Sequence, residues 1–183
     1  DSSLKVLLSC ALFILEDFMK KEFMDCAFDE GIKAFNNGEV PIGAVIVKNN
    51  KIIAKSHNSK ELNNCVLKHA ELNAIEIASK KNNNWRLEGC DIYITLEPCP
   101  MCASAIKQAR IKNVYSALSN KNKENFEIIS QIFKKDATNP EINFENNLYS
   151  ASSICEGRFC YNGEFSRIYS FATENIAGYI DYF

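Results

Sequence analysis

Apolar residues recur along the chain with two different periods, which predict alternating helices and strands. Helical spacing runs from Glu22 to Asn36 and ends at Asn37-Gly38, a typical helix stop. It returns in His69–Ser79 and in Cys99–Ala109. Short runs rich in β-branched and aromatic residues separate these helices and predict strands. The predicted strands are Val40–Val47, Lys51–Ala54, Asp91–Leu96 and Lys112–Ala117, the first two forming a hairpin.

The order of these elements predicts an α/β protein. A helix, a hairpin, a helix, a strand, a helix and a strand follow one another, which is typical of a sheet with helices on its faces. Residues 22–135 are expected to form this domain, after an N-terminal extension of unknown role, residues 1–21. Residues 136–183 hold half of the aromatic residues but no clean period. For them we predict no fold beyond packing on the same domain.

The run Leu4–Leu15 is apolar enough to resemble the core of a signal peptide. Lys5 lies inside this run, and Glu16 and Asp17 close it without a small-residue cleavage site. The run is also too short to span a bilayer. We therefore expect a helix, either packed on the domain or extending upstream of it, with a processed targeting segment as the alternative.

Composition and charge exclude several classes of protein. The 183 residues, 46% of them hydrophobic, suit one folded domain and not a disordered chain. The net charge is −2, but residues 48–135 carry 15 basic against 8 acidic side chains. A basic middle suits a polyanion, and scattered solvated lysines explain it equally well. The pI of about 5.8 argues against strong non-specific binding of nucleic acid.

The eight cysteines are too sparse for a secreted disulfide scaffold, and their spacing shows no repeating pairs. This usage predicts a reducing, cytoplasmic location, with a metal-binding or catalytic use for some of the thiols.

Cys99 and Cys102 form the most informative cysteine pair. Three residues apart in the first turn of a predicted helix, their thiols can reach one ion, and the helix dipole favours the thiolate. Pro98 precedes this helix, where a missing N–H costs nothing. Alone, the pair also suits a redox couple or half of a structural zinc site, which usually needs a second close pair. Cys155 and Cys160 offer only a wider and distant pair.

The string His69-Ala70-Glu71 changes that balance. The histidine begins a predicted helix, so a strand–helix layout can bring both helix N-termini to one edge of the sheet. One imidazole and two thiolates leave an open position on zinc for water, and Glu71 adds a carboxylate that can move protons. These residues together predict a hydrolytic site that removes an amino group from a heterocycle.

The pattern H-x-E followed by P-C-x-x-C is a signature of zinc nucleobase deaminases. Over residues 22–135 the chain also resembles the TadA-type tRNA-specific adenosine deaminases and their eukaryotic catalytic relatives. The resemblance is carried by Glu39–Val45 with its hairpin, Asn58, His69–Glu71 and Tyr93–Ala103.

This resemblance implies a cytidine-deaminase-like fold, a three-layer α/β/α sandwich with a mixed five-stranded sheet. It implies zinc-dependent hydrolysis of adenosine to inosine at the wobble position of tRNA anticodons. The expected partners are a tRNA anticodon stem-loop and a second subunit, in a homodimer or, in a eukaryote, a heterodimer. No membrane partner is expected.

The same resemblance assigns roles to seven residues. The metal ligands would be His69, Cys99 and Cys102, which would hold one Zn²⁺ per chain. Glu71 would be the catalytic residue and would shuttle protons between water, the ring nitrogen and the leaving ammonia. Asn58 would contact the flipped base, and the remaining substrate contacts would be Ala70 and Pro98.

Three departures from the family pattern bear on the substrate. Cys65-Val66-Leu67 stands where Asp-Pro-Thr is frequent, and Asn120 stands where an aspartate commonly lies near RNA. The family's basic, aromatic C-terminal helix has no clear counterpart in the acidic tail, where Arg158-Phe159 and Arg167 are either remnants of it or solvated surface.

Two alternative functions follow. Relatives of this fold act on free guanine, cytosine or dCMP, and Pro98–Cys102 also suits guanine deaminases while His69–Ala74 suits the dCMP branch. A non-catalytic, tRNA-binding subunit of a heterodimer would be marked by loss of the glutamate, and Glu71 is present.

Overall fold

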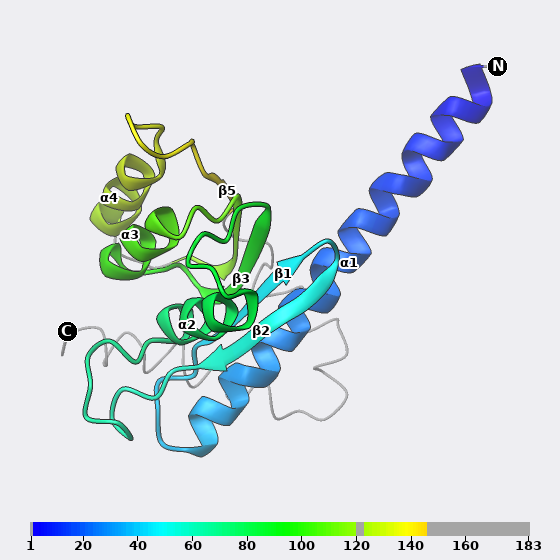
Figure 1. The fold of residues 1–183 in the computed structure, drawn as a ribbon. Helices are drawn as coiled ribbons and strands as arrows, with labels where there is room; N and C mark the ends of the chain where they lie inside the picture. Colours follow the sequence, from blue (N-terminus) through cyan, green and yellow to red (C-terminus); the bar gives the residue numbers. More distant parts are fainter. Residues whose placement is uncertain (1, 120–122, 146–183) are drawn as a thin grey trace.

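A computed structural model describes residues 2–119 and 123–145 of the chain (Figure 1). Asn120 and the segment from residue 146 onward, including Arg158-Phe159 and Arg167, therefore lie outside the described residues. The described elements are α1 (Ser2–Asn36), β1 (Gly43–Lys48), β2 (Lys51–His57), α2 (Ala70–Asn82), β3 (Cys90–Leu96), α3 (Pro100–Gln108), β4 (Asn113–Leu118), α4 (Lys123–Phe133) and β5 (Asn143–Glu145).

The five strands form one mixed sheet in the order β2-β1-β3-β4-β5. β1 is antiparallel to both of its neighbours, whereas β3, β4 and β5 are parallel to one another. Because β1 runs against both β2 and β3, these two strands share a direction, and their carboxyl ends lie at one edge of the sheet.

Helices cover both faces of this sheet. Figure 1 shows α1 against one face and α2, α3 and α4 against the other. Along β1 the side chains alternate between two cores, as the pleat requires. Ala44 and Ile46 pack with α2 and α3, whereas Val45 and Val47 pack with Phe28 and other residues of α1. The predicted three-layer α/β/α fold with a mixed five-stranded sheet is confirmed.

The predicted hairpin is also confirmed, with a tight turn between β1 and β2. Asn49 and Asn50 both have positive φ angles, 50° and 57°, as a type I′ turn requires. Asparagine tolerates this left-handed backbone better than most residues. The turn pairs Lys48 with Lys51, and a bulge in the pairing between Ile46 and Val47 then shifts the register by one residue, which brings His57 opposite Gly43.

Helix α1 is continuous from Ser2 to Asn36, so the predicted extension and the first predicted helix form one element. Its N-terminal half extends beyond the sheet in Figure 1. Within the part of the chain that the structure describes, no helix combines the length and apolarity needed to cross a bilayer.

Gly43, the first residue of β1, fixes how closely α1 approaches the sheet. A Cβ atom on Gly43 would lie 1.9 Å from the carbonyl oxygen of Ala27 and 2.6 Å from the backbone nitrogen of Gly31. Only glycine therefore fits beneath the backbone of α1. The Gly43 N–H donates to Thr95 Oγ1 at 3.1 Å, which ties β1 to the end of β3.

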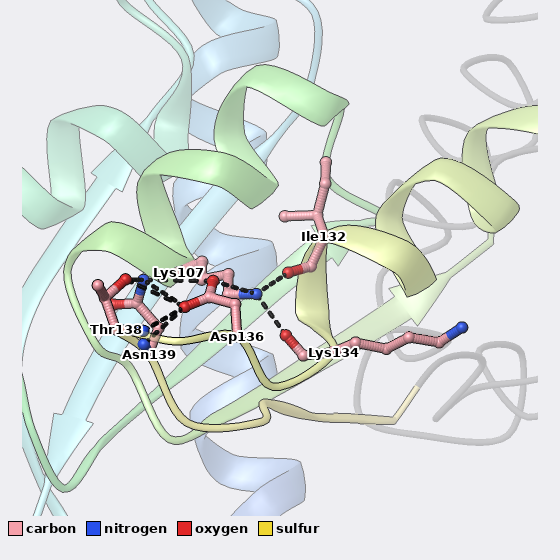
Figure 2. Close-up of polar contacts among 6 residues, drawn as sticks. All are labelled: Lys107, Ile132, Lys134, Asp136, Thr138 and Asn139. Atoms are coloured by element: carbon pink, nitrogen blue, oxygen red, sulfur yellow. Dashed lines mark hydrogen bonds and ion pairs between the residues drawn. The ribbon is translucent and has the colours of Figure 1, made fainter.

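Helix α4 and strand β5 lie where the sequence predicted no element. A buried lysine of α3 holds the C-terminal end of α4 (Figure 2). Lys107 Nζ donates to the carbonyl oxygens of Ile132, at 2.5 Å, and Lys134, and it forms an ion pair with Asp136 Oδ2 at 2.9 Å. These contacts use all three ammonium donors at the negative end of the helix dipole.

We expect Lys107→Met to lower the free energy of unfolding by about 2–3 kcal/mol, because methionine keeps the apolar stem but leaves two carbonyl oxygens without their buried donor and removes the ion pair with Asp136. Chemical denaturation at pH 7 measures this change. Lys80→Met is the control, since Lys80 is exposed and forms an ion pair with Glu76, a contact worth about 0.5 kcal/mol or less. Equal losses for the two variants would contradict the assigned role of Lys107.

The same cluster predicts an acid dependence of stability. Hydrogen bonds from Lys107 and from the backbone N–H groups of Thr138 and Asn139 lower the pKa of Asp136. A lowered folded-state pKa stabilises the fold above the ordinary aspartate pKa of about 4, and this contribution disappears as the pH falls further. The difference in stability between wild type and Asp136→Asn should therefore be largest near pH 7 and shrink as the pH falls below about 4. A difference that persists unchanged at pH 3 would contradict this assignment.

Candidate active site

Two helix N-termini meet at the edge where β2 and β3 end. His69 is the N-cap residue of α2, and Cys99 is the N-cap residue of α3. Both have extended backbones, and neither side chain caps its own helix, so the ring and the thiol remain available for each other. Pro100 lies in the first turn of α3, and the helix begins one residue after the predicted start at Cys99, which is its N-cap residue.

The imidazole of His69 faces both thiols of the Cys99/Cys102 pair. Its Nδ1 lies 3.8 Å from Cys99 Sγ and 3.5 Å from Cys102 Sγ. The three ligand atoms lie within 4.8 Å of one another. A tetrahedral zinc ion with ordinary bond lengths holds its nitrogen and sulfur ligands about 3.5 Å apart. These residues therefore fit zinc, with three protein ligands and one remaining position.

The thiols share protons with their neighbours in this arrangement. Hydrogen bonds with Cys102 and His69 lower the pKa of Cys99 to about 4. The pKa of Cys102 is raised, because its thiol hydrogen-bonds to Cys99 and is buried.

Glu71, in the first turn of α2, supplies a carboxylate beside these ligands. The residue is 3% exposed, and its Oε2 has no hydrogen-bond partner among the described residues. Burial raises the pKa of Glu71 to about 7. A buried carboxyl group with a free oxygen at this pKa can accept and return protons near neutral pH.

The other three predicted site residues are buried at the same edge. Asn58 directly follows β2, and its side-chain amide donates to Glu39 Oε2 at 3.1 Å. Ala70 is fully buried as the first residue of α2, and buried Pro98 precedes Cys99.

Three further residues organise this edge, and the sequence analysis gave none of them a role. Glu39 binds the segment that follows β2. Asn73 Nδ2 donates to the carbonyl oxygens of His57 and Lys68 and to Ser59 Oγ, which closes the same segment. Asn125 of α4 donates to Glu97 Oε1 and to the Pro98 carbonyl oxygen. Glu39 and Asn73 lie in strings that the sequence analysis used, Glu39–Val45 and His69–Ala74, whereas Asn125 had no sequence signal.

A family model described as MafB19-like deaminase matches residues 18–159 of this chain, which is most of its length. The tRNA-specific adenosine deaminase of Aquifex aeolicus is 47% identical over 104 residues, which cover 56% of this chain and 69% of the relative. The chain belongs to the deaminase family that this model describes. The tRNA-specific adenosine deaminase of Streptococcus pyogenes serotype M1 is 38% identical to this deaminase over 129 residues, covering 70% and 75% of the two chains.

Solved structures agree with this assignment. One comes from a study of A-to-I editing by tRNA:A34 deaminases at the wobble position of transfer RNA. It matches with a TM-score of 0.66 and 35% identity, over 73% of this deaminase and 96% of that chain. A guanine deaminase from Bacillus subtilis matches with a TM-score of 0.55 and 30% identity, over 78% and 93%. The resemblance to tRNA-specific adenosine deaminases and the classification as a nucleobase deaminase are confirmed.

The ligand geometry predicts one zinc ion per chain. Cys102→Ala should lower bound zinc to below about a tenth per chain, because two ligands cannot hold the ion against competing water and buffer. Elemental analysis after dialysis measures this ratio. Cys65→Ser is the control, since this thiol lies in the segment before His69 and outside the group of ligand atoms. Full zinc in the Cys102 variant would contradict the ligand set.

Proposed function

We propose that this protein is a zinc-dependent deaminase that converts adenosine to inosine at the wobble position of a tRNA anticodon. The observation that carries the proposal is the buried carboxylate of Glu71, with a free oxygen, beside a His/Cys/Cys group of zinc-like dimensions. The similarity to tRNA-specific adenosine deaminases supports adenosine in tRNA as the substrate.

Each residue of the proposed site has a separate role in this reaction. His69, Cys99 and Cys102 hold the ion, and bound zinc supplies the Lewis acidity that activates water at neutral pH. Glu71 accepts a proton from the attacking water and delivers protons to the ring nitrogen and to the leaving amine. The C–N bond breaks, so adenosine and water give inosine and ammonia. Asn58, Ala70 and Pro98 contact the base.

The base must leave the RNA stack to reach this edge of the sheet, as is general for enzymes that act on a base. A wobble nucleotide sits in a single-stranded loop, where extrusion costs less than in a duplex. We therefore expect an anticodon stem-loop as the partner, in the cytoplasm, with a second subunit completing the RNA site.

A free base is the second candidate substrate, because a guanine deaminase is 30% identical and shares the fold. Assays of the zinc-loaded protein on a stem-loop with wobble adenosine, free guanine, cytosine and dCMP separate these candidates. Inosine in the RNA alone supports the first proposal, and turnover of a small molecule replaces it with the second. Silence on all four substrates would indicate a non-catalytic subunit or a missing partner.

Glu71→Gln should lower kcat by about 10²–10⁴-fold while zinc content and thermal unfolding stay unchanged, since an amide cannot move the protons. Glu76→Gln is the matched control, because Glu76 lies on the same helix with its carboxylate exposed. Turnover retained in the Glu71 variant would refute its assigned role.

A further inference from the structure

The first cysteine ligand lies in a short segment between a strand and a helix. β3 ends at Leu96 and α3 begins at Pro100, so Cys99 is the last of the connecting residues 97–99. Cys102, in contrast, lies within α3 and moves only with that helix. The position of Cys99 Sγ therefore depends on how the connecting residues are held.

The backbone of this segment is tied to the sheet at its start. The Glu97 N–H donates to the carbonyl oxygen of Leu118, the last residue of β4, at 2.8 Å. Pro98 has no N–H to donate. Its carbonyl oxygen belongs to the peptide group that leads into Cys99, and it needs a donor from another part of the chain.

Asn125, near the start of α4, supplies that donor. Its Nδ2 donates to Glu97 Oε1 at 3.2 Å and to the Pro98 carbonyl oxygen at 3.4 Å. An amide NH₂ group carries two hydrogens, so it can serve both acceptors. Glu97 is 4% exposed and Asn125 is half-buried, so water competes weakly for these bonds. The amide thus contacts both residues directly before Cys99.

Helix α4 is itself fixed relative to α3. Ile129 of α4 and Ile106 of α3 are fully buried in the same core. At the far end of α4, Lys107 of α3 donates to the carbonyl oxygens of Ile132 and Lys134 (Figure 2). Asn125 therefore lies at a set position with respect to the helix whose start it contacts.

We propose that Asn125 is a positioning residue for the metal ligand Cys99, because its amide holds the peptide group before Cys99 and so directs the thiolate towards the ion. This rests on the proposed function, since it needs zinc bound by the His/Cys/Cys group. Without the amide, the thiolate leaves the ion more often and zinc is lost sooner. Outer contacts of this kind change metal affinity by about 10–100-fold.

Asn125→Ala tests this directly. Alanine removes the donor without adding a charge and favours the helix, so α4 should form as before. We expect zinc to leave the loaded variant about 10–100-fold faster than it leaves wild type at pH 7. Transfer of zinc from the protein to an excess of a coloured chelator measures this rate. An unchanged rate would overturn the proposal.

Asn113→Ala is the matched control. Asn113 Nδ2 also donates to a partly buried carboxylate, Asp91 Oδ1, but at the opposite end of β3 and β4. Loss of this pair should leave zinc release at the wild-type rate. Equal acceleration in both variants would mean that the loss of any such pair loosens the site through the fold as a whole, and it would overturn the specific role of Asn125.

Cobalt in place of zinc separates a misplaced thiolate from a less stable fold. Thiolates bound to Co²⁺ give charge-transfer absorption, so the absorption per bound ion reports how well the thiolates are placed. Asn125→Ala should lower this absorption towards the value for a single thiolate, whereas Asn113→Ala should leave it unchanged. If Asn125→Ala bound less cobalt but kept the wild-type absorption per ion, the loss would come from the fold and the proposal would be overturned.

These outcomes are distinct from failure of the proposed function. Wild type that retains no zinc overturns both proposals. Wild type that retains zinc but deaminates none of the four substrates overturns the proposed reaction, and the release rates still decide the role of Asn125. An active wild type whose zinc leaves no faster after Asn125→Ala overturns only the role of Asn125.

Discussion

Three donor atoms from two distant parts of the chain must come within reach of one ion, and the sheet topology meets this constraint. β1 runs against both β2 and β3, so these strands end at the same edge. The helices that follow them begin there, with His69 and Cys99 as their N-cap residues. A parallel β1 would have sent one of these helices to the opposite edge, and no local change could then have joined the ligands.

Close packing of α1 on β1 supports that edge from the other face. Gly43 leaves no room for a side chain beneath the helix backbone, and its N–H reaches Thr95 near the end of β3. The chain enters β1 directly from α1, with Glu39 between them. The contact that fixes α1 therefore also fixes Glu39, and through it the segment that follows β2.

Local patterns explain which parts of this architecture could be predicted from the sequence. Asn49-Asn50 encodes its own turn, and β1 shows an unbroken apolar run because helices cover both faces of the sheet. The ligands could be found because zinc chemistry restricts residue type and spacing. The short β5 strand could not be found, because three residues show no period and depend on pairing with β4. The sequence assigned no role to Glu39, because its role depends on hydrogen bonds with residues about twenty positions away.

Glu39 and Glu71 are both buried near this edge, but they differ in the hydrogen-bond donors that their carboxyl oxygens receive. Glu39 receives three N–H groups, so its charge is compensated and its oxygens are committed to structure. Glu71 has one oxygen without a hydrogen-bond partner among the described residues, and burial raises its pKa to about 7. A buried carboxyl group that lacks such donors gains by sharing a proton. The fold thus commits one carboxylate to holding an amide and leaves the other free for proton transfer.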